Sequence, residues 1–537
     1  MQQNVPNPAA MDAAGNLPPL RYALFRAVWC AALTANICVW MQNVAAAWLM
    51  VQFDSSPLMV ALVQTAITLP AFLLGLPAGV YADLLDRRHI LIGTHAWMLG
   101  ATILLYALLV TDHLGPWSLL FLTFTLGVGS AVSIPAWQAS TSDAVPRGSL
   151  SAAINLNAIA YNAARAIGPA LAGVIIASTG LEWVFALNIL LLLFVLSIFV
   201  FGYRPDSVTK AAPEPLLTAM RSGLRYVRHA RQLHGQILKT LFFVSCASSL
   251  WALLPLVADS DQAGGYGLLL GSLGAGAVLG GIVLNHVRAR ITNYGRLATL
   301  ANLAFLAAML VAAWVPSLYL TSATLVLAGA AWISFNSTTS AAFQTALPAW
   351  VRARALAIFM LTFQGSMAIG GVLWGAVANR LDVSWTLTIA AGLILVGMLL
   401  TRRYPLRMGN EAEVTPSAHW GEPRVYSSPN ADAGPIAVQI DYQVSEEHQA
   451  AFCQQLYRVG RVRKRDGASH WMLYRDLAHP ERLSERFIIA SWGEHQRQRN
   501  RSTLADREEE ERLKQFLLPG TSPSPSHYLL VAPEAVT

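Results

Sequence analysis

Charge is scarce in this chain. Only 12% of its 537 residues are Asp, Glu, Lys or Arg, whereas 55% are hydrophobic and the mean hydropathy is +0.45. A soluble protein does not have enough interior to hide so much apolar surface. The shortage of charge therefore excludes an ordinary soluble enzyme and predicts membrane-spanning helices.

Cysteine is also scarce. Cys30, Cys38 and Cys246 lie in apolar runs, and Cys453 lies in a polar region near the C-terminus. This spacing excludes a disulfide framework and a cysteine metal cluster, and we expect neither a metal nor another cofactor. A phosphate-binding Gly-Lys-Ser/Thr loop is missing, so ATP hydrolysis by this chain is not expected. Residues 1–20 lack the basic start and apolar core of a signal peptide, so we expect the first apolar helix to be retained.

Basic residues outnumber acidic ones, giving a net charge of +7 and a pI near 9.3. A nucleic-acid-binding protein shows such an excess, but basic loops on the cytoplasmic side of membrane helices produce it too. Because the apolar composition already requires a membrane, we favour the second interpretation and expect no nucleic acid partner.

Twelve apolar segments are present, each near the roughly 20 residues that a bilayer core requires. They lie at residues 23–51, 58–80, 89–110, 117–139, 151–177, 182–202, 236–257, 266–287, 295–314, 317–340, 355–378 and 383–401. Basic residues occupy alternate loops, from Arg87 and Arg88 onward, whereas the intervening loops contain only Arg380 as a basic residue. By the positive-inside tendency, this pattern predicts a multi-pass protein of the inner (plasma) membrane with both termini in the cytoplasm.

The second half of the apolar region repeats the first. A shift of 202 residues aligns the two halves without a gap. The aligned pairs include Pro146 with Pro348, Gly168 with Gly370, Gly173 with Gly375 and Trp183 with Trp385. Shared Gly, Pro and Trp at one offset predict an all-α membrane protein built from two pseudo-repeated six-helix bundles.

The chain becomes polar after Pro405. Strands are expected at 437–444, 469–475, 485–492 and 527–531, and helices at 446–465 and 494–516. This β-α-β-β-α-β order predicts a ferredoxin-like α+β domain. The predicted divisions are an N-terminal tail (1–20), two bundles (21–203 and 236–404) joined by a cytoplasmic loop (204–235), a flexible linker (405–435) and the soluble domain (436–537).

Residues 79–88, between the second and third segments, carry a motif with the sequence GVYADLLDRR. It resembles the signature that major facilitator transporters have between helices 2 and 3. The resemblance implies that Asp83 is a gating residue, which caps a helix and pairs with basic groups across the cytoplasmic face. Gly79, Arg87 and Arg88 complete the motif, and Asp86 stands where the family usually has Gly. The alternative is a charged loop that only stops a helix.

The corresponding position in the second half is occupied by Asn285 instead of an acid. We therefore expect an asymmetric cytoplasmic gate in which the loop of the first half dominates.

The fifth segment carries Gly168, Pro169 and Gly173, which resemble the helix-5 motif of exporters in this superfamily. Together with residues 135–138 (PAWQ) and 145–147 (VPR), they resemble the enterobactin-exporter-like branch, also described as transmembrane secretion effectors. Small residues allow close helix packing and Pro creates a bend, so helix packing alone is the alternative explanation.

The polar region carries residues 465–468 (RDGA), Trp471, 474–476 (YRD) and 491–495 (SWGEH). This run resembles the C-terminal extension of the same branch, and its fold resembles the antibiotic-biosynthesis monooxygenase type of dimeric α+β barrel. That resemblance implies a dimer through this domain. His470, Trp471 and His495 are the candidates for catalysis there, and a structural role for them is the favoured alternative.

Polar residues inside the predicted spans are candidates for a substrate cavity, because charge at the bilayer centre costs at least about 2.5 kcal/mol. These candidates are Asn36, Trp40 and Asn43 on one face of the first helix, Asn155, Asn162 and Arg165 on one face of the fifth, and Gln364, the repeat partner of Asn162. Arg165 is the best candidate for contact with an anion. Interhelical hydrogen bonding or snorkelling is the alternative for each of these residues.

These features predict a secondary active transporter that exports a siderophore or a hydrophobic drug-like small molecule by alternating access. Proton coupling is implied only by the family resemblance, because no Asp or Glu lies deep in a predicted span. Two alternatives stay open: a membrane-tethered enzyme whose C-terminal domain modifies a small aromatic compound, and a receptor that signals through that domain.

Overall fold

The structure is a computed structural model that describes residues 18–53, 56–202, 216–258, 263–287, 291, 293–417, 419–420, 425–426 and 429–531. Its contacts divide the chain into two compact units. The membrane unit comprises Met1–Pro213, Leu238–Thr339 and Met360–Arg403, and the tail unit comprises Glu214–Ile237, Ser340–Phe359 and Tyr404–Thr537. Most of the predicted N-terminal tail and the first part of the predicted central loop lie outside the described residues.

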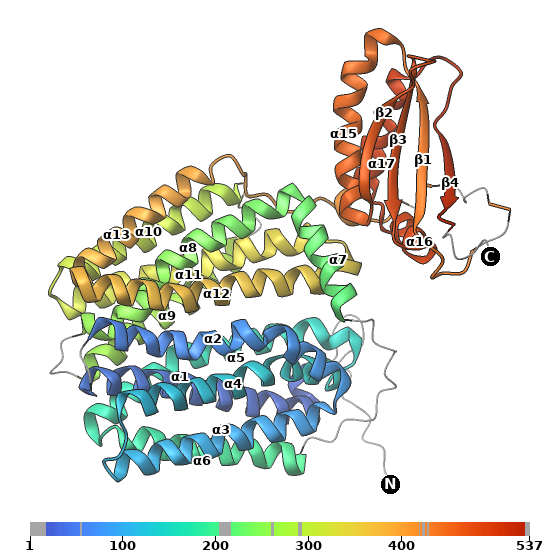
Figure 1. The fold of residues 1–537 in the computed structure, drawn as a ribbon. Coiled ribbons are helices and arrows are strands. Elements are labelled where there is room, and N and C mark those ends of the chain that lie inside the picture. The colour runs from blue at the N-terminus through green and yellow to red at the C-terminus, as the bar shows by residue number, and fades with distance from the viewer. Residues whose placement is uncertain are drawn as a thin grey trace. The chain divides into compact units, whose positions relative to one another are not determined.

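Twelve helices of the described chain are long and apolar enough to cross a membrane, which confirms the predicted number of spans (Figure 1). They are α1 (Ala23–Phe53), α2 (Pro57–Leu84), α3 (Arg87–Val110), α4 (Pro116–Asp143), α5 (Leu150–Ser178), α6 (Glu182–Ser197, continued by the π-helical turn Ile198–Gly202), α8 (Arg231–Val257), α9 (Ala263–Val287), α10 (Tyr294–Trp314), α11 (Leu318–Thr345), α12 (Ala349–Leu381) and α13 (Val383–Leu400).

Short polar side chains define where several of these helices begin. Asp86 accepts a hydrogen bond from the Arg88 amide at the start of α3, and Asp382 accepts one from the Trp385 amide at the start of α13. Such caps satisfy backbone N–H groups that a helix start leaves without a partner. These caps therefore define where the loops before α3 and α13 end.

The region near the C-terminus forms a four-stranded antiparallel sheet with helices, which confirms an α+β region. Its elements are β1 (Ile436–Gln443), α15 (Gln449–Asp466), β2 (Ser469–Arg475), β3 (Arg482–Ile489), α16 (Trp492–Arg501), α17 (Leu504–Glu511) and β4 (Ser524–Leu529). The strand order is β2-β3-β1-β4. Figure 1 shows α15 and α17 beside these strands.

Alternation along the strands explains the core of this region. Ile436, Val438 and Ile440 are buried, whereas the residues between them are half-buried, as expected for a sheet with one face in the core. Phe452 and Leu456, one helical turn apart on α15, belong to the same buried cluster.

Two elements differ from the predictions. The predicted helix at 494–516 is two helices, because the Thr503 side chain accepts from the Asp506 amide and starts α17 anew after Ser502. The predicted central loop contains a further helix, α7 (Leu216–His229), with Tyr226 and Val227 buried and Arg228 exposed. Apolar residues recur at helical spacing in this segment of the sequence, but the segment is too short to span a membrane.

The segment predicted as a linker carries a short helix, α14 (Glu411–Val414), and contacts within the tail unit. Pro416 forms an isolated bridge with Thr503, and Trp420 donates its indole N–H to Glu510 at 3.1 Å. These contacts hold parts of the segment against the α+β region.

Candidate functional site

Arg165 lies at the centre of a group of tryptophans in the membrane unit. Its side chain is only 6% exposed. The guanidinium carbon is 4.8 Å from the ring centre of Trp251, 5.6 Å from that of Trp40 and 5.8 Å from that of Trp332. Arg165 and Trp40 belong to the first half of the repeat, and Trp251 and Trp332 belong to the second. We call these four residues the arginine cage.

The cage leaves the arginine incompletely compensated. Within the described part of the chain, Nε and Nη2 of Arg165 have no hydrogen-bond partner. Cation–π contacts contribute about 2 kcal/mol when desolvated, whereas removing a charge from water costs several kcal/mol. A buried cation with free N–H groups among aromatic faces therefore favours a ligand that brings an anionic group and flat apolar surface.

A cavity adjoins the cage. Its lining includes Trp40 and Asn43 from α1, Gln64 from α2, Trp251 from α8 and Tyr266 from α9. Amide and phenol groups among aromatic and aliphatic walls suit an amphipathic organic molecule.

The structure brings together only some of the predicted cavity residues. Trp40 and Asn43 line the cavity, and Arg165 contacts the Trp40 ring that borders it. Asn36 and Asn162 instead donate to the backbone of their own helices, at Ala32 (2.7 Å) and Ala158 (2.8 Å). The remaining two do not line this cavity either: Asn155 is exposed on α5, and Gln364 is half-buried on α12.

The second-half tryptophans of the cage were missed from the sequence. Trp251 and Trp332 occupy apolar runs, and a Trp in a membrane helix has no pattern that separates core packing from ligand contact. Only their convergence on Arg165 identifies them.

The predicted gate motif forms real contacts at the start of α3. Arg87 forms an ion pair with Asp143 at the end of α4. Arg88 donates to the carbonyl oxygens of Phe199 (3.0 Å) and Val200 (2.5 Å) in the π-helical turn after α6. The basic pair therefore joins α3 to two other helices of the first half.

Two further motif residues lie in α2. Gly79 has open space where a Cβ would be, so close packing does not require glycine there. Asp83 lies in the last turn of α2, and its side chain is outside the described residues. The helix cap at this loop is Asp86, and the gating role of Asp83 stays a prediction.

Replacing Arg88 with Ala should destabilise the first half. Two backbone carbonyls would lose a charged donor, and such hydrogen bonds contribute about 1.5–3 kcal/mol each. We expect a lower unfolding temperature of the purified protein by several degrees. His89→Ala, on the same turn with an exposed side chain, is the matched control. Equal unfolding temperatures for both variants would contradict this role of Arg88.

The helix-5 motif lies at a close crossing of α5 and α9. A Cβ on Gly173 would be 2.9 Å from the Gly267 Cα, and a Cβ on Gly267 would be 2.6 Å from the Gly173 Cα. Gly168 instead faces α1 of its own half, where an added Cβ would lie 2.7 Å from the Trp40 Cβ. Small residues here let the two halves approach to backbone contact.

The same contact recurs between α2 and α12. The shift of 202 residues relates Pro169 to Gly371 and Thr65 to Gly267. A Cβ on Gly267 would meet the Pro169 carbonyl at 3.2 Å, and a Cβ on Gly371 would meet the Thr65 hydroxyl at 2.5 Å. The two crossings are therefore related by the sequence repeat.

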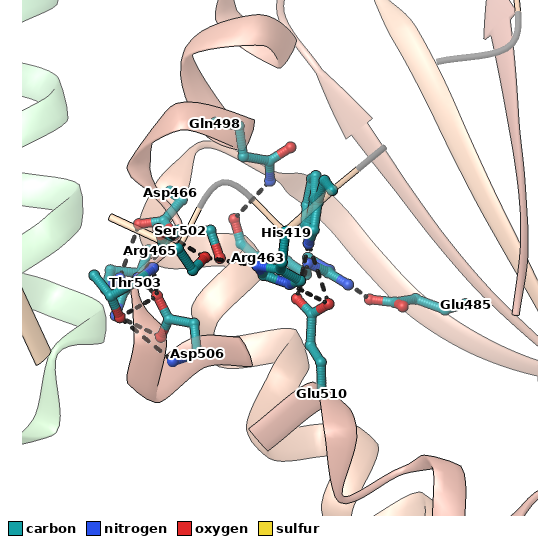
Figure 2. Close-up of polar contacts among 12 residues, drawn as sticks. His419, Arg463, Arg465, Asp466, Glu485, Gln498, Ser502, Thr503, Asp506 and Glu510 are labelled. Carbon is teal, nitrogen blue, oxygen red and sulfur yellow. Dashed lines mark hydrogen bonds and ion pairs between the residues drawn. The ribbon is translucent and has the colours of Figure 1, made fainter. Parts of the chain in front are cut away.

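A buried polar network lies inside the α+β region (Figure 2). Arg463 pairs with Glu510 (2.6 Å) and Glu485 (3.4 Å), and Trp471 donates its indole N–H to Glu485 at 2.7 Å. Burial alone would lower the pKa of Arg463, but the two carboxylates outweigh it and raise that pKa above its ordinary value. Trp471 therefore serves the core, which is the structural alternative considered for it.

His495 is buried and its Nε2 lies 3.0 Å from Nε2 of His527. Burial, followed by the neighbouring His527, lowers the pKa of His495 to about 4. His470 is exposed on β2. No group of three or more His, Cys, Asp or Glu side chains suited to a metal lies within the described chain.

Acid should destabilise the α+β region through His495. An unfolded His has a pKa near 6.5, so the unfolded chain binds the proton first as the pH falls. The stabilisation of the folded region by neutral His495 is complete above about pH 6.5 and is lost as the pH falls towards 4. This loss of stability amounts to roughly 3 kcal/mol. Thermal unfolding of the full-length protein between pH 7 and 4 measures it. His495→Gln should reduce this pH dependence, and an unchanged dependence would contradict the assignment.

Twelve spans, repeated inter-half crossings and a polar centre between the halves define a secondary transporter of the major facilitator type. The fold resembles that of the nucleoside transporter NupG, with a TM-score of 0.54 at 13% identity over 71% of this chain and 98% of that one. A bacterial homologue of the human lysosomal transporter Spinster gives a TM-score of 0.52 at 15% identity, over 71% and 98% of the respective chains.

The family model for transmembrane secretion effectors matches residues 14–534, and the chain belongs to that family. This is a family of transporters, not of enzymes. The MFS-type transporter YfiS of Bacillus subtilis (strain 168) is 26% identical over 382 residues, which cover 67% of this chain and 90% of that protein.

Proposed function

We propose that this protein exports a siderophore or a hydrophobic drug-like small molecule by alternating access. The substrate would enter the cavity beside the arginine cage from the cytoplasm and leave after the two halves rock about the α5–α9 and α2–α12 crossings. The family supports transport itself, and the resemblance of residues 135–138, 145–147 and 165–173 to the enterobactin-exporter-like branch supports outward movement of this substrate class.

The arginine cage is the observation that carries the proposal. Its members come from both halves, so a ligand bound there touches surfaces that separate during the cycle. Its unpaired N–H groups and indole faces match a ligand that combines rings with an acidic group. A ligand held by both halves couples their movement to its own binding.

Both termini are proposed to lie in the cytoplasm, which the positive-inside pattern supports. Proton antiport is proposed as the energy source. Uptake into inverted membrane vesicles with an imposed pH gradient tests both transport and coupling. A panel of siderophores and lipophilic drugs should include a compound that accumulates, and dissipating the gradient should abolish the accumulation. Asp83→Asn should slow it. Failure of every compound to accumulate in a gradient-dependent manner would refute proton-coupled export.

We also propose a ferredoxin-like α+β domain of the monooxygenase type that dimerises. The strand order β2-β3-β1-β4 supports the topology. Exposed Met472, Tyr474 and Tyr528 lie on the sheet face opposite the core, as the strand registers require, and they support a partner there. Light scattering of the detergent-solubilised protein should give twice the monomer mass, and Tyr528→Lys should reduce it.

A further inference from the structure

The two halves differ at the membrane face where the first half has its ion pair. Arg87 and Asp143 join the start of α3 to the end of α4. The shift of 202 residues places Ala289 and Thr345 at these positions in the second half. Alanine and threonine cannot form an ion pair, so the Arg87–Asp143 ion pair has no counterpart at these positions of the second half.

Thr345, at the end of α11, contacts the segment that leads into the α+β region. Its hydroxyl accepts a hydrogen bond from the Gly409 amide at 3.0 Å. A Cβ on Gly409 would collide with the carbonyl oxygen of Thr345, so only glycine permits this approach. The repeat position of Asp143 is therefore occupied by a residue that binds the C-terminal segment.

An ion pair joins the α+β region to α7. Arg225 on α7 lies 3.0 Å from Glu494 on α16, and Glu494 also binds Arg501 at 2.7 Å and Arg497 at 2.8 Å. Burial would raise the pKa of Glu494, but the arginines, Arg501 foremost, lower it below its ordinary value. Glu494 is thus an ionised anchor that three arginines share.

Two stacked arginines extend the contact to the start of α12. Arg501 lies 4.2 Å from the ring centre of Trp350, and Arg465 lies 5.2 Å from that of Tyr226. The two rings form an edge-to-face pair at 5.5 Å. Asp466 and Asp506, seen beside Arg465 in Figure 2, hold that guanidinium in place.

These contacts all lie within the tail unit, which also includes the ends of several membrane helices. The tail unit contains the α+β region, α7, the first two turns of α8, the end of α11 and the first turns of α12. All of the membrane helices in this set belong to the second half of the repeat, so within the described residues continuous helices join the tail unit to that half.

We propose that the α+β domain completes the gate of the second half: docked on α7 and on the α11–α12 corner, it replaces the Arg87–Asp143 ion pair of the first half. The domain then moves with the second half during transport, and it stabilises the end of α11, where the repeat has no counterpart of that ion pair. This inference rests on the transporter class alone and requires no particular substrate or coupling ion.

Hydrogen exchange of the full-length protein in lipid nanodiscs tests the proposal. Arg225→Ala should speed exchange about fivefold or more both in α7 and across residues 340–355, because a coupling of 1–3 kcal/mol corresponds to roughly 5–150-fold. Residues 140–147 in the first half should not change. Arg87→Ala should speed exchange across residues 140–147 and leave residues 340–355 unchanged. Arg228→Ala, on the exposed side of α7, is the matched control for the loss of an arginine.

Faster exchange in α7 with unchanged exchange at 340–355 would overturn the proposal, since the domain would be docked without holding the corner. Unchanged exchange in both would overturn it too, since Arg225 would not hold the dock. Protection of β1 and β3 reports whether the domain is folded. If Arg225→Ala unfolds it, Gly409→Val tests the same corner from the other contact, and the same loss of protection at 340–355 is expected.

Discussion

The Arg165→Gln variant should have an apparent affinity for its substrate that is about 100-fold lower than that of the wild type. Truncating one partner of a buried charged contact costs roughly 2–5 kcal/mol. Glutamine keeps hydrogen-bonding groups at this position but removes the positive charge and the cation–π contacts with Trp251 and Trp40. The free protein should not be destabilised, because the variant also removes a buried charge whose Nε and Nη2 have no partner among the described residues. Concentration-dependent uptake into inverted vesicles measures the effect.

Arg380→Gln is the matched control, because this exposed arginine lies at the end of α12, where the chain leaves its span. It should transport like the wild type. Arg165→Lys separates charge from shape: a lysine retains attraction to an anion but cannot form a planar, bidentate contact, so an intermediate affinity is expected. Wild-type affinity in Arg165→Gln would show that the cage packs the helices and does not bind substrate.

Composition and periodicity were sufficient to identify the membrane spans and the strands. A span is defined by about 20 apolar residues, a property that each helix carries locally, so all twelve could be read from the sequence. The strands of the α+β region were placed within a few residues for the same reason, since period-two burial is local. α7 was missed because its apolar face is short and its partner lies far along the chain.

The site could be predicted only in part. Arg165 was identifiable because a charge inside an apolar run is rare and costly. Asn36 and Asn162 share the same helical faces as Trp40 and Arg165, yet their amides bond to their own helices, an outcome that spacing cannot distinguish from ligand contact. The contacts of Trp332 with Arg165 and of Thr345 with Gly409 join residues that are distant in sequence and meet only in the folded chain.

Adding one methyl group at Gly267 should impair transport more than adding one at Gly271 on the same helix. The new Cβ of Gly267→Ala would lie 2.6 Å from the Gly173 Cα and 3.2 Å from the Pro169 carbonyl, and backbone atoms cannot rotate away as a side chain can. Overpacking of this kind costs about 1–3 kcal/mol, so transport should fall roughly tenfold and the unfolding temperature should drop by several degrees. Gly271→Ala, one turn later on the same helix, is the matched control because its Cβ would meet Ala170 at an ordinary 3.7 Å. If both variants transport equally well, the halves have slack at this crossing and it cannot be the axis about which they rock.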